Sequence, residues 1–174
     1  MKLQATQVDI TTLGVDAIVN AANAQLSPGG GVDGAINQVA GPELARAMRA
    51  LGGCPTGEAR ITPGFDLPAK YVIHAVGPIW RGGNHGEPEL LACAYRSALI
   101  LAREHECHSV AFPAISTGVY GYPLEDATRV AVETVRAFTP ESGSVALIHF
   151  ACFGEEALNA YRQTGVAATG IILS

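Results

Sequence analysis

The sequence predicts an α/β fold in which a sheet is covered by helices on both faces. Short apolar runs alternate with segments of helical periodicity along the whole chain, as in strand–helix–strand units. The composition agrees, because 48% of the 174 residues are hydrophobic and only 16% are charged, which provides enough apolar surface for one substantial core. No internal repeat or low-complexity segment interrupts the alternation.

The first part of the chain is predicted to hold two strands and two helices. Met1–Gln7 alternates apolar and polar residues, and Ala17–Asn20 is a short apolar run, so both are expected to be strands. The patterns of Val32–Ala40 and Pro42–Leu51 predict two short helices. The proline that opens the second helix stands where a helix needs no N–H donor.

The middle of the chain is predicted to form two strands and one long helix. Ala59–Pro63 and Tyr71–Val76 are separated by a turn-rich segment, and the second run ends at Gly77-Pro78. Glu89–Glu104 places its apolar residues on one face at helical spacing, which makes it the clearest helix of the sequence.

The last third repeats the order of strand, loop and helix. Ser109–Pro113 predicts a strand and Leu124–Phe138 a helix, and Ser144–Phe150 and Glu155–Gln163 predict a final strand and helix. The apolar tail Thr164–Ser174 has two interpretations, an edge strand or a segment packed over the end of the sheet. The sequence does not choose between them.

Charge and cysteine usage exclude several classes of protein. With 16 acidic and 11 basic residues the formal charge is -5, and no stripe of Lys or Arg favours direct nucleic-acid binding. The four cysteines show no paired spacing, and the amino terminus lacks the apolar segment of a signal peptide. No apolar run is long enough to cross a bilayer. We expect a cytoplasmic protein with free, mostly buried thiols and no membrane partner.

The strongest chemical signal is the glycine-rich segment Gly29–Gly34, which leads directly into a predicted helix. Adjacent glycines let the backbone approach a ligand closely, and a helix start offers unpaired N–H groups to a phosphate. Asp33 lies at the same junction, where an acid beside bound phosphates costs electrostatic energy unless it has a chemical role. Asp33 is therefore a candidate catalytic residue. The alternative is a helix-end acid that only complements the dipole.

The same segment formally fits the dinucleotide-binding fingerprint of oxidoreductases, as Gly29-x-Gly31-x-x-Gly34, but that match alone is weak. In the fingerprint the strand turns sharply into the helix, whereas here eight residues, Ala21–Pro28, follow the predicted strand. No acidic residue ends the next strand to hold a ribose. Because no Gly-Lys-Ser or Gly-Lys-Thr occurs, a P-loop is excluded.

A second candidate loop is Pro113–Pro123, which combines hydroxyl groups, glycines and an aromatic residue between a strand and a helix. Consecutive backbone N–H groups can hold a diphosphate there without a cationic side chain. The alternative is an ordinary turn stiffened by proline. Ligands of such sheets bind at the carboxyl ends of strands, so both loops are expected to meet there.

Six separated motifs resemble those of the macrodomain family, in particular its MacroD-type branch, which includes bacterial O-acetyl-ADP-ribose deacetylases. In chain order they are Asp9–Thr11, Val19–Asn23, Gly29–Ile36, Cys54–Gly57, Val72–Pro78 and Ile115–Pro123. The resemblance covers nearly the whole chain. It implies one macrodomain over residues 1–174, folded as a three-layer α/β/α sandwich around a mixed, largely parallel sheet.

The resemblance implies a hydrolase that binds ADP-ribose and cleaves esters at its distal ribose. The implied substrates are O-acetyl-ADP-ribose and mono-ADP-ribosylated proteins, and neither a cofactor nor a metal is implied. Two other functions stay open. One is a binding module that reads ADP-ribose without turnover. The other is a regulatory role through contact with another protein, such as a ribonuclease.

Individual binding roles also follow from the resemblance. Asp9, with Ile10 beside it, is implied to accept the adenine amino group, and Phe153 to pack against adenine. A turn acid and a core phenylalanine are the alternatives for Asp9 and Phe153. Asn20 and Asn23 are implied to line the distal ribose. The residues expected to wrap the diphosphate and distal ribose, mainly through backbone N–H groups, are Gly29, Gly30, Gly31, Val32, Ser116, Thr117, Gly118, Val119 and Tyr120.

The implied catalytic residues are Asp33, Asn23 and Tyr120. Asp33 would orient or deprotonate the water that attacks the ester, and Tyr120 would close over the distal ribose. The sequence departs from the family at Asn37, where members commonly carry a histidine on the same helical face as the acid. Asn37 cannot shuttle a proton. Either the enzyme is slower or differently selective, or the chain mainly binds ADP-ribose.

Other conspicuous residues have structural interpretations. His74 lies in a predicted core strand and is expected to be a hydrogen-bonded structural histidine. The segment His105–His108 is expected to be a solvated helix end rather than a metal site. Cys54 has no histidine beside it and is not expected to be a nucleophile. Trp80–Gly83 is expected to be a mobile rim loop.

Overall fold

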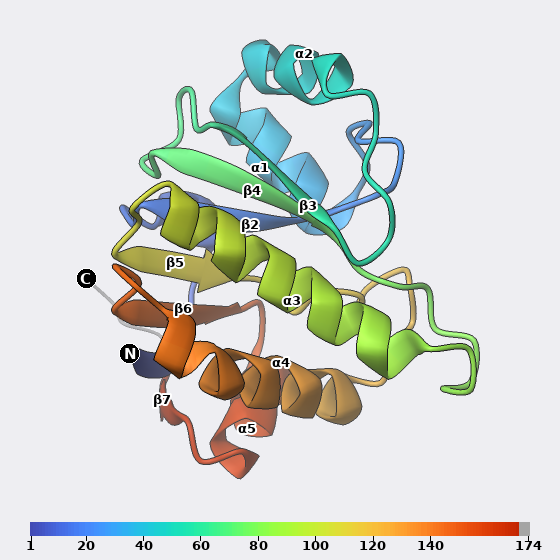
Figure 1. Cartoon of the computed structure of the whole chain (residues 1–174), viewed down its shortest axis with the longest axis vertical. Coiled ribbons are helices and arrows are strands. Elements are labelled where there is room, and N and C mark those ends of the chain that lie inside the picture. Colours follow the sequence, from blue (N-terminus) through green and yellow to red (C-terminus); the bar gives the residue numbers. More distant parts are fainter. Residues whose placement is uncertain (171–174) are drawn as a thin grey trace.

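The structure, a computed structural model, describes residues 1–170 and is built on a seven-stranded sheet (Figure 1). The strands are β1 Lys2–Gln7, β2 Ala17–Ala22, β3 Ala59–Pro63, β4 Tyr71–Val76, β5 Ser109–Phe112, β6 Leu147–Cys152 and β7 Ala167–Thr169. Their spatial order is β3-β4-β2-β5-β6-β1-β7. Only β3 and β4 pair antiparallel, and all other neighbours pair parallel. The predicted mixed, largely parallel sheet is confirmed.

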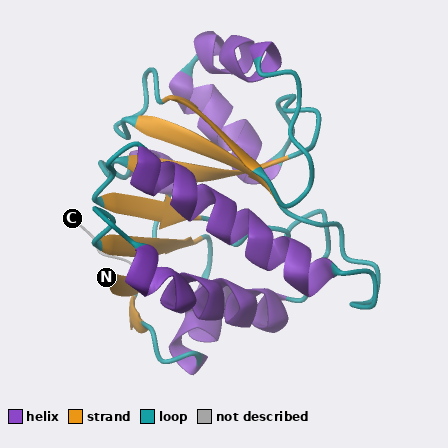
Figure 2. Cartoon of the chain, viewed as in Figure 1, coloured by secondary structure: helices purple, strands orange, loops and turns teal. Residues whose placement is uncertain are grey.

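Helices cover both faces of this sheet, which gives the predicted three-layer α/β/α sandwich (Figure 2). They are α1 Gly31–Ala40, α2 Pro42–Ala50, α3 Glu87–Glu104, α4 Leu124–Phe138 and α5 Glu155–Gln163, with short 3₁₀ helices η1 Ile10–Thr12 and η2 Thr139–Glu141. Buried residues of α3, α4 and α5 share one apolar cluster, and those of α1 and α2 share another. The two clusters lie on opposite faces because successive strand residues point to opposite sides.

The central strands are apolar on both faces. In β2, Val19 belongs to the cluster under α3, and its neighbour Ile18 belongs to the cluster under α1. In β4, Ile73 and Val72 divide in the same way. Strands buried on two faces read as continuous apolar runs, which explains why these segments were recognisable in the sequence.

Several predicted boundaries are wrong by a few residues, most clearly the last long strand. β6 begins at Leu147, not at Ser144, because its pairing with both β1 and β5 starts there. Ser144 instead donates its hydroxyl to the Cys107 carbonyl, 3.0 Å away. β2 runs two residues past the prediction because it pairs with β4 as far as Ala22. The helix α3 starts two residues early, at Glu87.

The described part of the tail forms the edge strand β7, which pairs parallel with β1. Residues 171–174 lie outside the described residues. The four cysteines are free thiols, as predicted, and three of them are buried, with Cys93 exposed. No helix within residues 1–170 is both long and apolar enough to cross a membrane.

Candidate functional site

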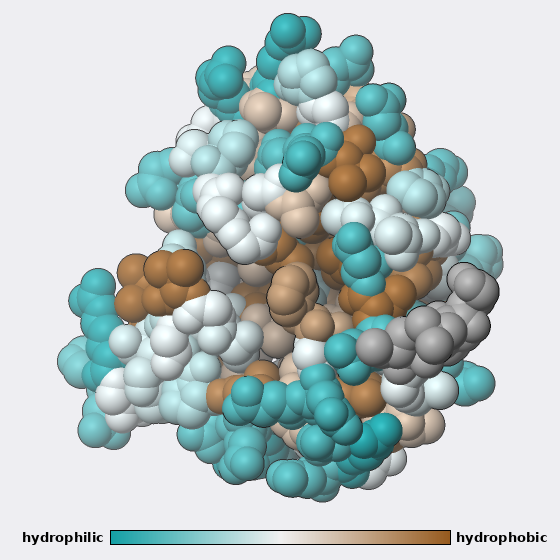
Figure 3. Space-filling view, turned by 180° about the vertical axis from the view of Figure 1, so that it is seen from behind, coloured by the Kyte–Doolittle hydropathy of each residue, from teal (hydrophilic) through white to brown (hydrophobic). Residues whose placement is uncertain are grey.

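The two predicted loops meet at one edge of the sheet, where they enclose a pocket of about 980 Å³. One loop follows β2 and leads into α1, and the other connects β5 to α4. Because β2 and β5 are parallel neighbours, their carboxyl ends lie side by side. The volume falls at the upper end of the range for small-molecule sites, about 300–1,000 Å³. The space-filling view from behind the sheet shows apolar side chains around a hollow (Figure 3).

The glycine loop presents unpaired donors to this pocket. Gly30 is the N-cap of α1 and has no side-chain cap, and Gly31 adopts a φ of 57°, which favours glycine. Within the described residues, the N–H groups of Gly31, Val32 and Asp33 have no partner. A Cβ on Gly34 would lie 2.8 Å from the Gly29 carbonyl oxygen, so the loop lies directly against the helix. The result is a helix start open to an anion.

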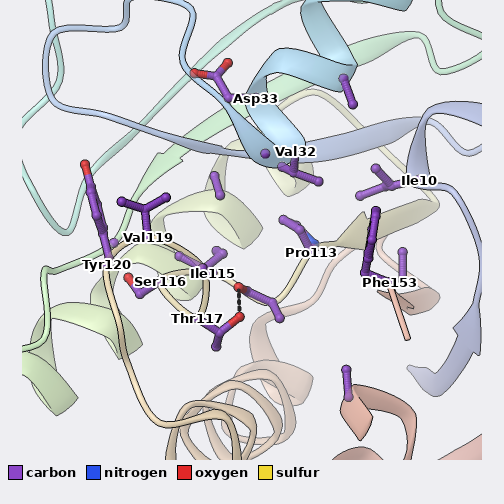
Figure 4. A pocket seen from close by; sticks show the side chains of 18 of the residues that line it. Ile10, Val32, Asp33, Pro113, Ile115, Ser116, Thr117, Val119, Tyr120 and Phe153 are labelled. Carbon is purple, nitrogen blue, oxygen red and sulfur yellow. Dashed lines mark hydrogen bonds between the residues drawn. The ribbon is translucent and has the colours of Figure 1, made fainter. Parts of the chain in front are cut away.

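The second loop offers a matching set of donors. Ser116 has a φ of 70°, and its buried hydroxyl has no partner in the described part of the chain. The N–H groups of Gly118, Val119 and Tyr120 are likewise unpartnered among residues 1–170. A hydrogen bond within the loop holds its conformation: the Thr117 hydroxyl donates to the Ala114 carbonyl at 2.8 Å, which is the dashed line in Figure 4.

No Lys or Arg is among the described residues that line the pocket. The charged side chains on its wall are Asp9, Asp33 and Glu156, all acidic. An anion bound here must therefore be held by backbone N–H groups and helix dipoles rather than by cations.

Asp33 is buried at the start of α1 and holds three side-chain hydrogen bonds. Its Oδ1 accepts from Nδ2 of Asn20 and from Nδ2 of Asn37, both at 2.9 Å, and its Oδ2 accepts from the Gly29 N–H at 3.0 Å. Burial raises the pKa of Asp33, and these three bonds oppose the rise. An ionised carboxylate has about four acceptor sites, so Oδ2 keeps one site for a water or ligand.

The structure places one of the three asparagines, Asn20, differently from the prediction. Asn23 lines the pocket, with its side chain held by the backbone of Ser27 through bonds of 2.8 and 3.1 Å. Asn20 is fully buried and does not line the pocket, because its amide is turned toward Asp33 and His74. The implied contact of Asn20 with the ribose is corrected to a contact with the acid. Asn37 shares a helical face with Asp33, as expected, and supplies a fixed donor.

The predicted adenine and distal-ribose residues lie at opposite ends of the pocket (Figure 4). Ile10 and Phe153 are together at one end, and Asp33 and Tyr120 are at the other. Asp9 also lines the pocket, and its Oδ1 caps η1 by accepting from the N–H and hydroxyl of Thr11, which leaves Oδ2 available. An elongated ligand with a base at one end and a sugar at the other fits this arrangement.

Comparison with known proteins decides the family. The Macro domain family model matches residues 19–131, which include both loops. The chain belongs to the macrodomain family.

Relatives and solved structures of macrodomains are similar over most of this chain. A Macro domain-containing protein of Chlorobaculum tepidum is 56% identical over 92% of this chain and 94% of the relative. An O-acetyl-ADP-ribose deacetylase of Salmonella gallinarum is 55% identical over 93% of each. An Oceanobacillus iheyensis macrodomain mutant with ADPR superposes with a TM-score of 0.88 at 43% identity, over 92% of this chain and 90% of that one. A Trypanosoma brucei macrodomain in complex with ADP-ribose has a TM-score of 0.87 at 45% identity, over 94% and 68%.

Sequence reasoning missed several residues of this macrodomain site. Gly77, at the end of β4, lines the pocket, and a Cβ there would lie 2.2 Å from the Ser116 hydroxyl oxygen. Its signals in the sequence were its place in the motif Val72–Pro78 and at the strand end Gly77-Pro78. Glu156 and Ala157 of α5 also line the pocket, near Phe153, and no local pattern marked them.

The loop Trp80–Gly83, which was expected to be mobile, is held by contacts at both of its ends. The Trp80 ring packs against Tyr122, with ring centroids 4.6 Å apart, and the Trp80 backbone N–H donates to the Tyr120 carbonyl at 2.9 Å. The buried carboxylate of Glu87 accepts from the N–H groups of Arg81, Gly83 and His85, at 2.6 to 2.9 Å. The Trp80–Gly83 loop therefore packs against the second pocket loop and supports it, rather than covering the pocket.

The Glu87 bonds predict an acid-dependent loss of stability. Burial raises the pKa of Glu87, but the backbone hydrogen bonds outweigh it and lower the pKa from 4.5 to about 2. A lowered folded-state pKa stabilises the fold above pH 4.5 and loses its effect as the pH falls toward about 2. Glu87→Gln is expected to be less stable than the wild type at neutral pH, with the gap closing on acidification. Urea unfolding across this pH range measures it, and a gap that stays constant would contradict the interpretation.

His74 and His105 have the structural contacts that were expected of them. His74 is fully buried and bonded to Asn20 and Thr62. The His105 ring bonds the Leu101 carbonyl at the end of α3. Among residues 1–170 no group of three or more His, Cys, Asp or Glu side chains is placed to hold a metal ion.

Proposed function

We propose that this chain is an ADP-ribose-binding hydrolase that cleaves esters at the distal ribose of ADP-ribose. Its substrates are O-acetyl-ADP-ribose and proteins that carry mono-ADP-ribose on acidic side chains. The observation that carries the proposal is that one pocket holds both unpartnered backbone N–H donors from two loops and, at one end, the buried acid Asp33. The deacetylase relatives from Salmonella and the ligand of the Trypanosoma brucei structure support it.

Each part of ADP-ribose is assigned to its own part of the pocket. Adenine packs on Phe153 beside Ile10, and the free Oδ2 of Asp9 accepts from its amino group. The diphosphate lies between Gly30–Val32 and Ser116–Tyr120 and accepts from the unpartnered N–H groups of these segments, among them those of Gly31, Val32, Gly118, Val119 and Tyr120. This order places the distal ribose between Asn23 and Tyr120, near Asp33.

Hydrolysis needs one activated water. Oδ2 of Asp33 has one free acceptor site, where it can hold a water and take its proton. The water oxygen bonds to the ester carbonyl carbon, the bond between that carbon and the ribose oxygen breaks, and the ribose oxygen leaves as a hydroxyl with the proton that Asp33 took from the water. For O-acetyl-ADP-ribose the products are acetate and ADP-ribose. Tyr120 closes over the ribose and positions the ester.

Release of products tests the proposal directly. Purified protein is incubated with O-acetyl-ADP-ribose and, separately, with a protein carrying mono-ADP-ribose on a carboxylate. Turnover of the first to acetate and ADP-ribose, and release of ADP-ribose from the second, are the expected results. A protein that binds ADP-ribose and turns over neither substrate is a binding module instead, which is the alternative that Asn37 in place of the family histidine favours.

An aromatic anchor for adenine predicts a selective loss of affinity in Phe153→Ala. The side chain is 98% exposed, so its removal costs the fold little. Base–aromatic stacking contributes about 1–3 kcal/mol per base, so ADP-ribose affinity is expected to fall roughly tenfold or more. Phe65→Ala is the control, because Phe65 is 36% exposed and does not line the pocket. Calorimetric titration measures both, and equal affinities for the two variants would refute the adenine assignment.

We further propose that residues 1–174 form one macrodomain working in the cytoplasm. One sheet takes strands from near both ends of the chain, which supports a single folding unit. A regulatory contact with a ribonuclease stays a prediction from the family resemblance. Co-purification of the two proteins tests it.

A further inference from the structure

A chain of buried polar side chains runs from Asp33 on α1 away from the pocket and across the three strands β2, β4 and β3. Asn20 on β2 places its Nδ2 2.9 Å from Oδ1 of Asp33 and 3.1 Å from Nδ1 of His74 on β4. On its other side the His74 Nε2 lies 2.9 Å from Oγ1 of Thr62 on β3. Asn20, His74 and Thr62 are all buried and none lines the pocket, so none is placed to touch a ligand.

The direction of each hydrogen bond follows from the proton count. An amide nitrogen carries two N–H donors and no acceptor site, and an ionised carboxylate only accepts. Asn20 therefore donates one N–H to Asp33 and the other to His74, whose Nδ1 must carry a lone pair. Burial lowers the pKa of His74 to about 4, so the ring is neutral at neutral pH and carries one proton. That proton is on Nε2, and it is donated to the Thr62 hydroxyl.

The opposite arrangement is incompatible with an ionised Asp33. With the proton on Nδ1, His74 would donate to Asn20, and the Asn20 amide would have to turn its Oδ1 toward both His74 and Asp33. An amide oxygen facing a carboxylate is repulsive unless the acid is protonated. No bond holds the amide from its far side, since Oδ1 of Asn20 is buried and has no partner in the described residues. The orientation of the amide thus depends on the two acceptors of Nδ2.

We propose that His74, held by Thr62 in its Nε2–H form, is a positioning residue that fixes the Asn20 amide so that it donates to Asp33. This inference deepens the proposed function, on which it rests for its effect on turnover. The tautomer of His74 is a property of the ligand-free protein and is testable by itself. His74 does not line the pocket, and it acts on Asp33 through Asn20, whose amide donation favours the ionised form of the acid.

Charged groups do not complicate this network. Asp33 and His74 are its two titratable members, and within residues 1–170 no Lys, Arg, Asp or Glu is among the groups that shift the pKa of either. The groups facing Asp33 are the neutral Asn20 and Asn37 amides and the Gly29 N–H. Losing the Asn20 donation removes a contact that lowers the pKa of Asp33. The acidic limb of the pH–rate profile should then move to higher pH.

The first test reads the tautomer directly. Long-range ¹⁵N–¹H correlation spectra of the full-length, ¹⁵N-labelled protein report which nitrogen of each of its five histidines is protonated. The His74 signals are assigned from their loss in His74→Asn. A protonated Nε2 with an unprotonated Nδ1 is the expected result. A proton on Nδ1, alone or with Nε2, would overturn the proposal whatever the enzyme does.

The second test reads the consequence for turnover. Thr62→Val removes the acceptor for the Nε2 proton and keeps the shape, and Thr62→Ser keeps the hydroxyl. Because one hydrogen bond is involved, Thr62→Val and His74→Phe are expected to lower kcat about tenfold, with KM little changed and the acidic limb at higher pH. Thr62→Ser should stay near the wild type. His149→Asn, which changes another buried histidine away from the pocket, is the control.

The outcomes separate this inference from the proposed function. A wild type that turns over neither substrate defeats the proposed function, and the spectra still decide the tautomer. An active wild type with unchanged kcat and pH profile in both Thr62→Val and His74→Phe defeats the positioning role. If Thr62→Val fails to fold, His74→Phe and the wild-type spectra keep the proposal open to refutation.

Discussion

Asp33→Ala is expected to lower kcat for O-acetyl-ADP-ribose by about 10²- to 10⁴-fold, the usual contribution of a positioned general base. ADP-ribose affinity should be unchanged or higher, because the carboxylate lies in the same pocket as the bound phosphates and repels them. A residue that only stabilises the helix end would produce neither result. Single-turnover kinetics and calorimetric titration of the same variant measure the two quantities.

Two further variants make this result interpretable. Asp33→Asn keeps the shape but cannot take a proton, and it tests whether the loss follows from the missing base rather than from the Asn20 and Asn37 donors left unpaired. Glu155→Ala removes an exposed acid next to the pocket that does not line it, and it should keep wild-type turnover. Turnover by Asp33→Asn within about threefold of the wild type would rule out proton transfer to Asp33.

Gly34→Ala is expected to weaken ADP-ribose binding by about tenfold to a hundredfold and to slow turnover as well. A Cβ at this position would lie 2.8 Å from the Gly29 carbonyl oxygen, which is backbone and cannot rotate away. Relief of the overlap must move the glycine loop. Overpacking of this kind costs about 1–3 kcal/mol, and each 1.4 kcal/mol is a factor of ten in affinity. The same shift would disturb the Gly29 N–H that holds Oδ2 of Asp33.

Gly14→Ala is the matched control for that experiment. Gly14 has no atom within 4 Å of an added Cβ and does not line the pocket. Its affinity and turnover should equal those of the wild type. If Gly34→Ala binds ADP-ribose as tightly as Gly14→Ala, the glycine loop does not hold the diphosphate through its backbone.

The order of the elements could be predicted because each one carries its own local pattern. β3, β4, α4 and α5 have the bounds predicted from the sequence. β6 was misplaced because its start is set by the starts of β1 and β5, which are distant in sequence. The tail was undecided for the same reason, since β7 exists only through its pairing with β1. Pairing between distant segments is not visible in a local pattern.

The site was predictable where a loop carried its own chemistry and not where a contact joined distant segments. The glycine loop, the Ser116–Tyr120 loop and Asp33 were recognisable from composition and from their places beside strands and helices. The orientation of the Asn20 amide toward Asp33 could not be predicted, because the amide also contacts His74, which is 54 residues away in the sequence. The fastening of the Trp80 loop by Glu87 was also missed, because a glutamate at a helix start gives no sign that it accepts three backbone N–H groups.

A crystal structure of the protein with ADP-ribose tests the binding mode that all of the proposed chemistry requires. We expect the diphosphate oxygens within hydrogen-bonding distance of the unpartnered N–H groups in Gly30–Val32 and Ser116–Tyr120, with the distal ribose beside Asn23 and Asp33. A diphosphate bound elsewhere, or a distal ribose at the Phe153 end of the pocket, would contradict the assignment of Asp33 as the acid that acts on the ester.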